Sequence, residues 1–170
     1  MLRITGHSIV VEYQLITDDY VPLTFENLEE SNSITYLYIA GRTNTQMLEI
    51  GVDSNTGVIQ RVILPMLPEI GRTTALVNEK ALYIRGVPKI DVSAWPAQDE
   101  IINHWDRRII KDTISFTALI TDNTMMIRLS PDQVVTYYAT DDLYFGANEL
   151  LELVEIKVCN MSSKKFDPDV

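Results

Sequence analysis

The feature that most constrains this fold is a period-two alternation of apolar and polar side chains. It is clearest over residues 113–121, and 48–53 and 154–158 repeat it. In the first of these runs the alternating apolar residues are Ile114, Phe116, Ala118 and Ile120. Side chains on a β-strand point to opposite faces in turn, so such a run has one apolar face and one face that meets water.

Other strand-like segments are rich in Val, Ile, Tyr and Thr, the residues that suit a pleated surface. They span residues 8–16, 34–40, 59–64, 80–87, 125–129 and 133–139. The sequence therefore predicts a mainly β protein, either an antiparallel two-sheet sandwich or a strongly curved sheet, with one or two short helices. A mixed α+β arrangement is the alternative.

Turn-forming residues separate these segments. Residues 53–57, Asp-Ser-Asn-Thr-Gly, predict a hairpin with Gly57 at a positive φ. Asp122-Asn123 predicts a second tight hairpin, and Ser130-Pro131-Asp132 predicts a third break because proline removes a ladder donor. These turns predict a meander of consecutive strands in the second half of the chain.

Two segments have helical character. Residues 97–110 follow Pro96, carry acidic residues near the start and basic residues near the end, and bear apolar residues at helical spacing. The apolar residues on that side are Ile101, Ile102, Trp105, Ile109 and Ile110. A helix there is expected to cover one face or one open end of a sheet. Residues 24–30 are expected to form one or two helical turns.

The two halves of the chain contain similar segments. Residues 48–53, Leu-Glu-Ile-Gly-Val-Asp, resemble residues 143–148, Leu-Tyr-Phe-Gly-Ala-Asn. Each is followed by a second strand-like run, at 59–64 and at 153–158. Two halves of related sheet topology would produce this pattern, and so would chance, because a turn, a glycine and a strand recur in β proteins.

Length and charge restrict the class of protein. A chain of 170 residues suits one domain, which we expect over 1–161, followed by a flexible polar tail over 162–170.

A formal net charge of -10 repels phosphate backbones and anionic membranes, so nucleic acid and membranes are unsuitable partners. It attracts a basic protein. One cysteine and no long apolar run predict a cytoplasmic protein.

The residues that usually carry chemistry are few and scattered. His7, His104 and Cys159 lie far apart in the sequence, without the short spacing of a metal site or a base with its partner. Asp53-x-Asn55-x-Gly57 resembles the start of a calcium loop, but the position of its last acidic ligand is Leu64. The sequence therefore predicts a protein that is not an enzyme, with no catalytic residues, no cofactor and no metal.

An acidic segment at residues 18–30 is the candidate partner-binding surface. It contains five acidic residues and two aromatic residues, and it has no Lys or Arg. An acidic patch with aromatic anchors suits a basic protein partner, whereas a solvated polar face is the alternative interpretation. The candidate residues are Asp18, Asp19, Tyr20, Phe25, Glu26, Glu29 and Glu30.

The strand, turn and strand patterns at 48–64 and 143–162 resemble those of small immunity proteins of bacterial toxin–immunity loci. The resemblance implies a non-enzymatic protein that binds and neutralises a cognate toxin, and it implies no particular site residues. Two other functions stay open. One is a structural or self-assembling protein that forms homo-oligomers through uncovered strand edges. The other is a small-ligand-binding β protein, or a divergent enzyme, with a pocket lined by Tyr and Trp.

Overall fold

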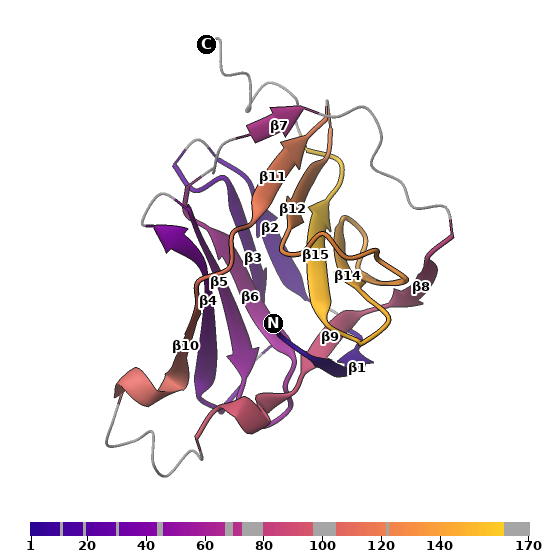
Figure 1. Cartoon of the computed structure of the whole chain (residues 1–170). Helices are drawn as coiled ribbons and strands as arrows, with labels where there is room; N and C mark the ends of the chain where they lie inside the picture. The colour runs from indigo at the N-terminus through magenta and orange to yellow at the C-terminus, as the bar shows by residue number, and fades with distance from the viewer. Residues whose placement is uncertain are drawn as a thin grey trace.

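In a computed structural model of the chain, two β-sheets lie face to face, as the mainly β prediction required (Figure 1). The structure describes residues 1–10, 12–18, 20–29, 31–43, 46–66, 70–72, 80–96, 105–121 and 123–161. The expected tail, 162–170, lies outside the described residues. The first half of the chain supplies most of one sheet, and the second half supplies most of the other.

The first sheet has six strands: β2 (Tyr13–Ile16), β3 (Leu23–Asn27), β4 (Thr35–Thr43), β5 (Gln46–Asp53), β6 (Ile59–Leu64) and β10 (Ile109–Asp112). Their order across the sheet is β10-β4-β5-β6-β3-β2. β10 runs parallel to β4, and the other described pairs in this sheet are antiparallel.

The second sheet has seven strands: β7 (Ile70–Arg72), β8 (Leu82–Arg85), β11 (Thr117–Ile120), β12 (Met125–Arg128), β13 (Thr136–Ala139), β14 (Leu143–Ala147) and β15 (Leu153–Val158). Their order is β7-β11-β12-β15-β14-β13-β8, with parallel pairing at both edges. A small third sheet pairs β1 (Ile4–Ser8) with β9 (Val87–Ile90) in antiparallel orientation.

The core lies between the two large sheets and follows the alternation in the sequence. Apolar side chains of β3, β5 and β6 meet those of β12, β14 and β15 in one buried cluster. The Phe25 ring of one sheet lies edge-on to the Phe145 ring of the other, with 6.2 Å between their centroids. Burial of one such ring stabilises the fold by roughly 1.5–3 kcal/mol, which is large beside a typical net stability of about 5–15 kcal/mol.

The strand order is the same in the two large sheets. In the first, β3 lies beside β6, and β4 and β5 follow on the other side of β6 in the order β3-β6-β5-β4. In the second, the corresponding order is β12-β15-β14-β13. Each is a Greek key, extended by an antiparallel hairpin strand (β2 or β11) at one end and by a parallel strand (β10 or β8) at the other.

The predicted meander is therefore partly wrong. β11 and β12 form the expected hairpin across residues 121–124, and β13, β14 and β15 are consecutive neighbours. However, β12 pairs with β15 and not with β13. The segment after Ser130 does not turn back beside β12. Leu129 N and Ser130 N donate to Val154 O of β15, and Val135 N donates to Ala147 O of β14. The chain therefore passes these two strands before β13 begins.

The similarity between residues 48–53 and 143–148 corresponds to equivalent strands, β5 and β14. The strand register shifts directly after Gly51 in one and directly after Gly146 in the other. The following turns also match. Asp53 N donates to Val58 O at 2.9 Å, and Asn148 N donates to Glu152 O at 3.1 Å.

The small third sheet joins the two halves through corresponding contacts. Gly57, with φ 73°, and Leu151, with φ 59°, occupy equivalent turn positions. Ile90 N donates to Gly57 O, and Ile4 N donates to Leu151 O, each at 2.7 Å. Ile4 and Ile90 are themselves paired across β1 and β9. Each half of the chain therefore places one strand against a turn of the other half.

The expected helices are largely absent from the described residues. Residues 24–27 belong to β3, because Leu23, Phe25 and Asn27 alternate into the buried face. Residues 97–104 lie outside the described residues, 105–108 form a 3-10 turn, and 109–110 begin β10. A second 3-10 turn, Val92–Ala94, begins where Asp91 accepts a hydrogen bond from Ser93 N.

The paired turns provide a test of the fold. In Gly57→Ala the new Cβ would lie 2.3 Å from Ile90 O, and φ is positive, so we expect a loss of about 1–3 kcal/mol. In Leu151→Gly, relief of left-handed strain and the greater freedom of the unfolded chain oppose each other, so stability should change by less than about 1 kcal/mol. Urea denaturation measures both variants, and a Gly57→Ala variant as stable as the native protein would contradict the close contact between this turn and Ile90.

Candidate functional site

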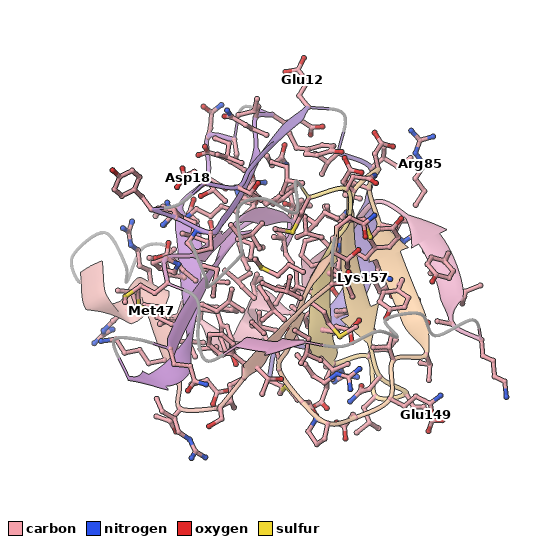
Figure 2. All side chains as sticks on the ribbon, turned by 90° about the horizontal axis from the view of Figure 1, so that it is seen from above. Glu12, Asp18, Met47, Arg85, Glu149 and Lys157 are labelled. Atoms are coloured by element: carbon pink, nitrogen blue, oxygen red, sulfur yellow. The ribbon has the colours of Figure 1, made fainter. Side chains whose placement is uncertain are left out.

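The acidic segment forms the hairpin of β2 and β3 at one edge of the six-stranded sheet. In the register of this hairpin, Gln14 lies opposite Glu26 and Ile16 lies opposite Thr24. Leu28 N donates to Glu12 O at 2.9 Å, which places Glu12 beside Leu28 at the base of the hairpin. Figure 2 shows Glu12 and Asp18 at separate points along the outer edge of the molecule.

Asp18 organises the tip of this hairpin. Its Oδ1 accepts hydrogen bonds from Tyr20 N at 2.8 Å and Val21 N at 2.6 Å. Asp18 N also donates to Val21 O at 3.4 Å, which closes the turn. Tyr20 is thereby held outward, and 92% of its surface is exposed. An exposed aromatic ring is a suitable anchor for a protein partner, because it can bury a large apolar area on association.

Phe25 does not belong to this surface, contrary to the prediction. It is fully buried between the sheets, where its ring packs against Tyr13 at 5.6 Å and Phe145 at 6.2 Å. The reason is strand alternation: Leu23 and Phe25 face the core, while Glu26 faces solvent. Phe25 therefore supports the hairpin from inside and is not available to a partner.

The remaining acidic candidates are exposed where the structure describes them. Glu26 and Glu29 face solvent, whereas Asp19 and Glu30 lie outside the described residues. Asn27 Oδ1 accepts from Glu29 N at 3.0 Å and fixes the end of the hairpin. The structure adds Glu12 to the acidic surface. Sequence reasoning missed it because it lies on the other side of β2, and only the strand pairing brings it near Leu28 and Glu29.

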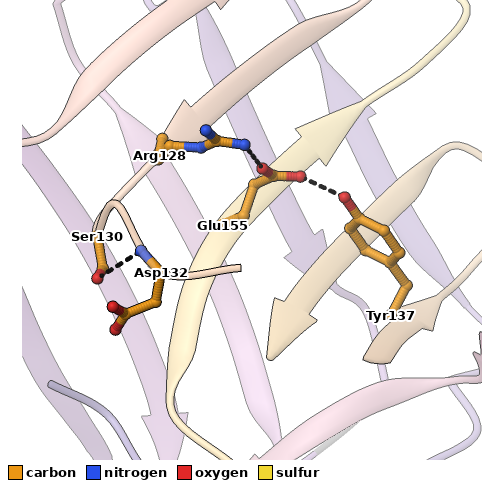
Figure 3. A network of polar contacts seen from close by, with 5 residues as sticks. All are labelled: Arg128, Ser130, Asp132, Tyr137 and Glu155. Atoms are coloured by element: carbon orange, nitrogen blue, oxygen red, sulfur yellow. Dashed lines mark hydrogen bonds and ion pairs between the residues drawn. The ribbon is translucent and has the colours of Figure 1, made fainter. Parts of the chain in front are cut away.

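A second polar cluster lies on the outer face of the seven-stranded sheet. Glu155 on β15 is 1% exposed, and its carboxylate accepts hydrogen bonds from Tyr137 Oη at 2.6 Å and Arg128 Nη2 at 3.0 Å (Figure 3). Burial raises the pKa of the Tyr137 phenol, and the adjacent Glu155 carboxylate raises that pKa further. The nearby Asp132 is held by its N–H bond to Ser130 Oγ at 3.2 Å.

Two further tyrosines and a lysine extend this cluster towards the sheet edge. Tyr83 stacks on Tyr137 at 5.3 Å, and Tyr144 lies edge-on to Tyr137 at 6.2 Å. Lys157 Nζ lies 4.6 Å from the Tyr137 ring centroid and 4.7 Å from that of Tyr144, which is cation–π geometry. Glu155 and Lys157 are themselves buried, so the two charges at the centre of this cluster are shielded from solvent.

A pocket of about 270 Å³ lies between β10 and the segment that follows β9. Its polar lining includes Arg3, Tyr38, Asp91, Lys111 and Asp112. Tyr38 Oη donates to Asp112 Oδ2 at 2.7 Å, and the Met1 amino group lies 3.3 Å from the same oxygen. Burial raises the pKa of Tyr38, and its hydrogen bond to Asp112 adds to that effect. Trp95, stacked on Tyr36, forms the apolar wall with Leu2 and Ile110.

The residues considered as metal ligands or bases are separated in the fold. His7 lies on β1 against the Tyr138 ring, 6.0 Å between centroids, and Cys159 follows β15. His104 lies outside the described residues. Within the described part of the chain, no group of three or more His, Cys, Asp or Glu side chains could hold a metal ion.

Residues 53–57 form the predicted hairpin turn, with Gly57 at a φ of 73°, and Asp53 caps this turn. Its Oδ1 accepts from Asn55 N at 2.9 Å and Thr56 N at 2.8 Å, and its Oδ2 accepts from the hydroxyls of Ser31 and Ser33. Burial alone would raise the pKa of this carboxyl, but the bonds from Ser31, Ser33 and Thr56 outweigh burial and lower the pKa to about 2. The equivalent turn in the second half is capped by Asn148, whose Oδ1 accepts from Leu150 N and Glu152 N.

Comparison with models of known protein families gave no match to this chain, and comparison with curated protein sequences gave none either. Among the residues that the structure describes, no helix combines the length and the apolar character needed to cross a membrane.

Asp53→Asn should keep the turn but lose the charge-assisted bonds. Since the folded pKa is below the ordinary 3.8, the carboxylate stabilises the fold above about pH 4, and this stabilisation disappears as pH falls towards 2. We expect the variant to be less stable than the native protein by about 2 kcal/mol at pH 7. We also expect its free energy of unfolding to fall less than that of the native protein when the pH is lowered from 4 to 2. Denaturant unfolding at several pH values measures this, and Asp141→Asn is the exposed control. An unchanged acid transition would contradict the assignment.

Tyr137→Phe should destabilise the protein by about 1–3 kcal/mol, because Glu155 loses a buried donor. Tyr138→Phe is the matched control, since Tyr138 is buried on the other face of the same strand and faces the core. Thermal unfolding compares the two variants. Equal effects of both substitutions would show that the Tyr137–Glu155 bond has no special importance.

Proposed function

We propose that this protein is a non-catalytic protein-binding module whose acidic hairpin, β2 with β3, contacts a basic protein partner. The observation that carries the proposal is Tyr20: its side chain is 92% exposed, and its backbone N–H donates to the Asp18 carboxylate. Large aromatic rings that bury on association account for much of the energy of protein interfaces.

The charge of the hairpin that carries Tyr20 at its tip supports a basic partner. Glu12, Glu26 and Glu29 are exposed on the same hairpin, and residues 12–30 contain no Lys or Arg. Opposite charge accelerates the encounter of two proteins and excludes like-charged competitors. Because Phe25 anchors the hairpin in the core, the acidic residues are presented on a supported strand pair rather than on a free loop.

The proposed partner is a basic toxin, and the protein would then act as its immunity protein in the cytoplasm. Such a protein needs a stable scaffold and an accessible surface, and it needs no catalytic group. The feature that supports this is the acidic hairpin just described, which is carried on a scaffold of two packed sheets.

A second candidate function, the binding of a small ligand, is favoured by the pocket beside β10. Tyr38 and Trp95 line it, and it holds two carboxylates, Asp91 and Asp112. Its volume of about 270 Å³ suits a small metabolite. Native mass spectrometry would then show a bound mass that is absent from Ala94→Trp, a substitution that fills the pocket. A protein without any bound mass would favour the protein-binding function.

Site-specific photo-crosslinking in the source cells tests the binding surface directly. A photoreactive p-benzoylphenylalanine at position 20 should capture one basic protein. The same group at position 150 is the control, because Leu150 is also strongly exposed and lies in the β14–β15 turn. Identical crosslinked species from both positions, or none from position 20, would contradict the proposal.

Charge reversal tests the steering role once the partner is captured. Glu12→Lys with Glu26→Lys should slow association by about tenfold at low salt and flatten its salt dependence. Asp141→Lys with Glu149→Lys changes the net charge equally, and Figure 2 shows Glu149 on the opposite side of the molecule from Glu12. Surface plasmon resonance measures both rates. Equal slowing by the two pairs would show that only net charge matters.

A further inference from the structure

The strand β2 forms one edge of the six-stranded sheet, and in the described part of the chain no strand pairs with its outer side. Natural proteins often protect such an edge with lysine, proline or a β-bulge, because a regular open edge pairs readily with another strand. β2 contains no lysine and no proline, and its pairing with β3 has no register shift. The edge is therefore regular and lacks these three protections.

The pairing with β3 identifies which backbone groups of β2 face outward. Leu28 N donates to Glu12 O, so these two residues form a hydrogen-bonded pair. Hydrogen-bonded and non-hydrogen-bonded pairs alternate along an antiparallel ladder, so the N–H and C=O groups of Tyr13 and Leu15 point away from β3. Among the described residues these groups have no hydrogen-bond partner. The edge therefore presents two residues that are in position to extend the sheet.

The two faces of β2 differ in chemistry. Tyr13 and Leu15 are half-buried and pack against the core, so their apolar surface is only partly covered at this edge. On the other face Glu12 and Gln14 are exposed, and Glu26 lies opposite Gln14 on β3. Figure 2 shows the Glu12 side chain projecting away from the molecule. A strand that completes this edge needs apolar residues towards the core and basic residues towards the acidic face.

The charge of this face favours a basic partner over a second copy of the chain. Arg61 lies opposite Glu26 on β6, but its guanidinium already forms an ion pair with Glu49. Residues 12–30 contain no Lys or Arg. A second copy paired at β2 would bring two acidic faces together on one side of the joined sheet, where like charges repel each other.

We propose that the basic partner binds by strand addition: one of its extended segments, with Lys or Arg at every second position and apolar residues between them, pairs with β2. This inference rests on the proposed function and adds the way in which the partner is recognised. Antiparallel pairing is the more stable orientation per residue. Hydrogen bonds to Tyr13 and Leu15 then provide affinity, and the alternation of apolar and basic side chains provides specificity.

A short peptide of alternating lysine and valine, blocked at both ends, is the probe for strand addition. Bound to the isotope-labelled full chain, it should slow hydrogen exchange of the Tyr13 and Leu15 amides by at least about tenfold at saturation, because these N–H groups gain acceptors. A peptide with the same residues in two blocks has the same charge without the alternation. It should bind at least about tenfold more weakly. NMR titration measures both peptides.

Leu15→Pro separates the backbone bonds from the charge. Proline removes an N–H that points away from β3, so the hairpin should form while the alternating peptide binds at least about tenfold more weakly. Leu15→Ala is the matched control, because it loses the same side chain but keeps the N–H, and it should bind the peptide more tightly than Leu15→Pro. Circular dichroism establishes that both variants are folded.

N-methylation of the valines in the peptide tests the same bonds on the native protein. In the antiparallel arrangement these valines lie opposite Tyr13 and Leu15 and donate to their C=O groups, so the methylated peptide should also bind at least about tenfold more weakly. Equal binding of the methylated and unmethylated peptides would overturn strand addition. So would a failure of the alternating peptide to bind at about 1 mM, or equal binding to folded Leu15→Pro and Leu15→Ala.

These outcomes are distinct from a failure of the proposed function, which the crosslink at position 20 tests. Capture of a basic protein there, together with unchanged exchange at Tyr13 and Leu15 in the presence of the peptide, would keep the binding surface and overturn only the strand addition. A dimer of the native protein in sedimentation equilibrium that is lost in Leu15→Pro would identify a second copy as the occupant of β2, and it would also overturn the proposal.

Discussion

Burial of one face of each large sheet against the other is the constraint on which the whole structure depends. The alternation that fills this interface also decides what is left outside. On β3 it places Phe25 in the core and Glu26 in solvent, and on β15 it places Ile156 in the core and Glu155 on the outer face. The supported acidic hairpin and the charged cluster on the opposite sheet therefore arise from the same packing requirement.

The two halves retain the same topology but differ in the chemistry of equivalent positions. Arg61 lies opposite Gly51 and pairs with Glu49, whereas Glu155 lies opposite Gly146 and pairs with Arg128. A charged residue thus lies opposite the glycine at each register shift, with its sign inverted between the halves. Similarly, one turn is capped by Asp53 and the other by Asn148. In both turns a polar side chain accepts hydrogen bonds from the backbone N–H groups of the turn, and this residue can be either aspartate or asparagine.

Sequence patterns predicted the local structure better than the long-range pairing. Alternation gave the mainly β class, and the turn residues gave the hairpins at 53–57 and 121–124. Strand order was not predictable, because nothing near Ser130 indicates that β12 pairs with β15 rather than β13. Phe25 was misplaced because Phe25 and Leu28, three residues apart, fit helical spacing, whereas in the strand they lie on opposite faces, and a short apolar run does not distinguish the two structures. The exposed position of Tyr20 depends on a turn that Asp18 caps through Tyr20 N and Val21 N, which are only two and three residues away in the sequence.

The path of the chain between the two Greek keys affects how the protein unfolds. After β6 the chain adds β7 and β8 to the second sheet, pairs β9 with β1, returns to the first sheet as β10, and only then begins β11. Loss of either sheet would therefore remove a strand from the other sheet or from the pair that joins them. Despite its repeated topology, the molecule should consequently melt in a single cooperative transition, without a half-folded intermediate. Because so many pairings join distant residues, its refolding should be slow for a chain of this length.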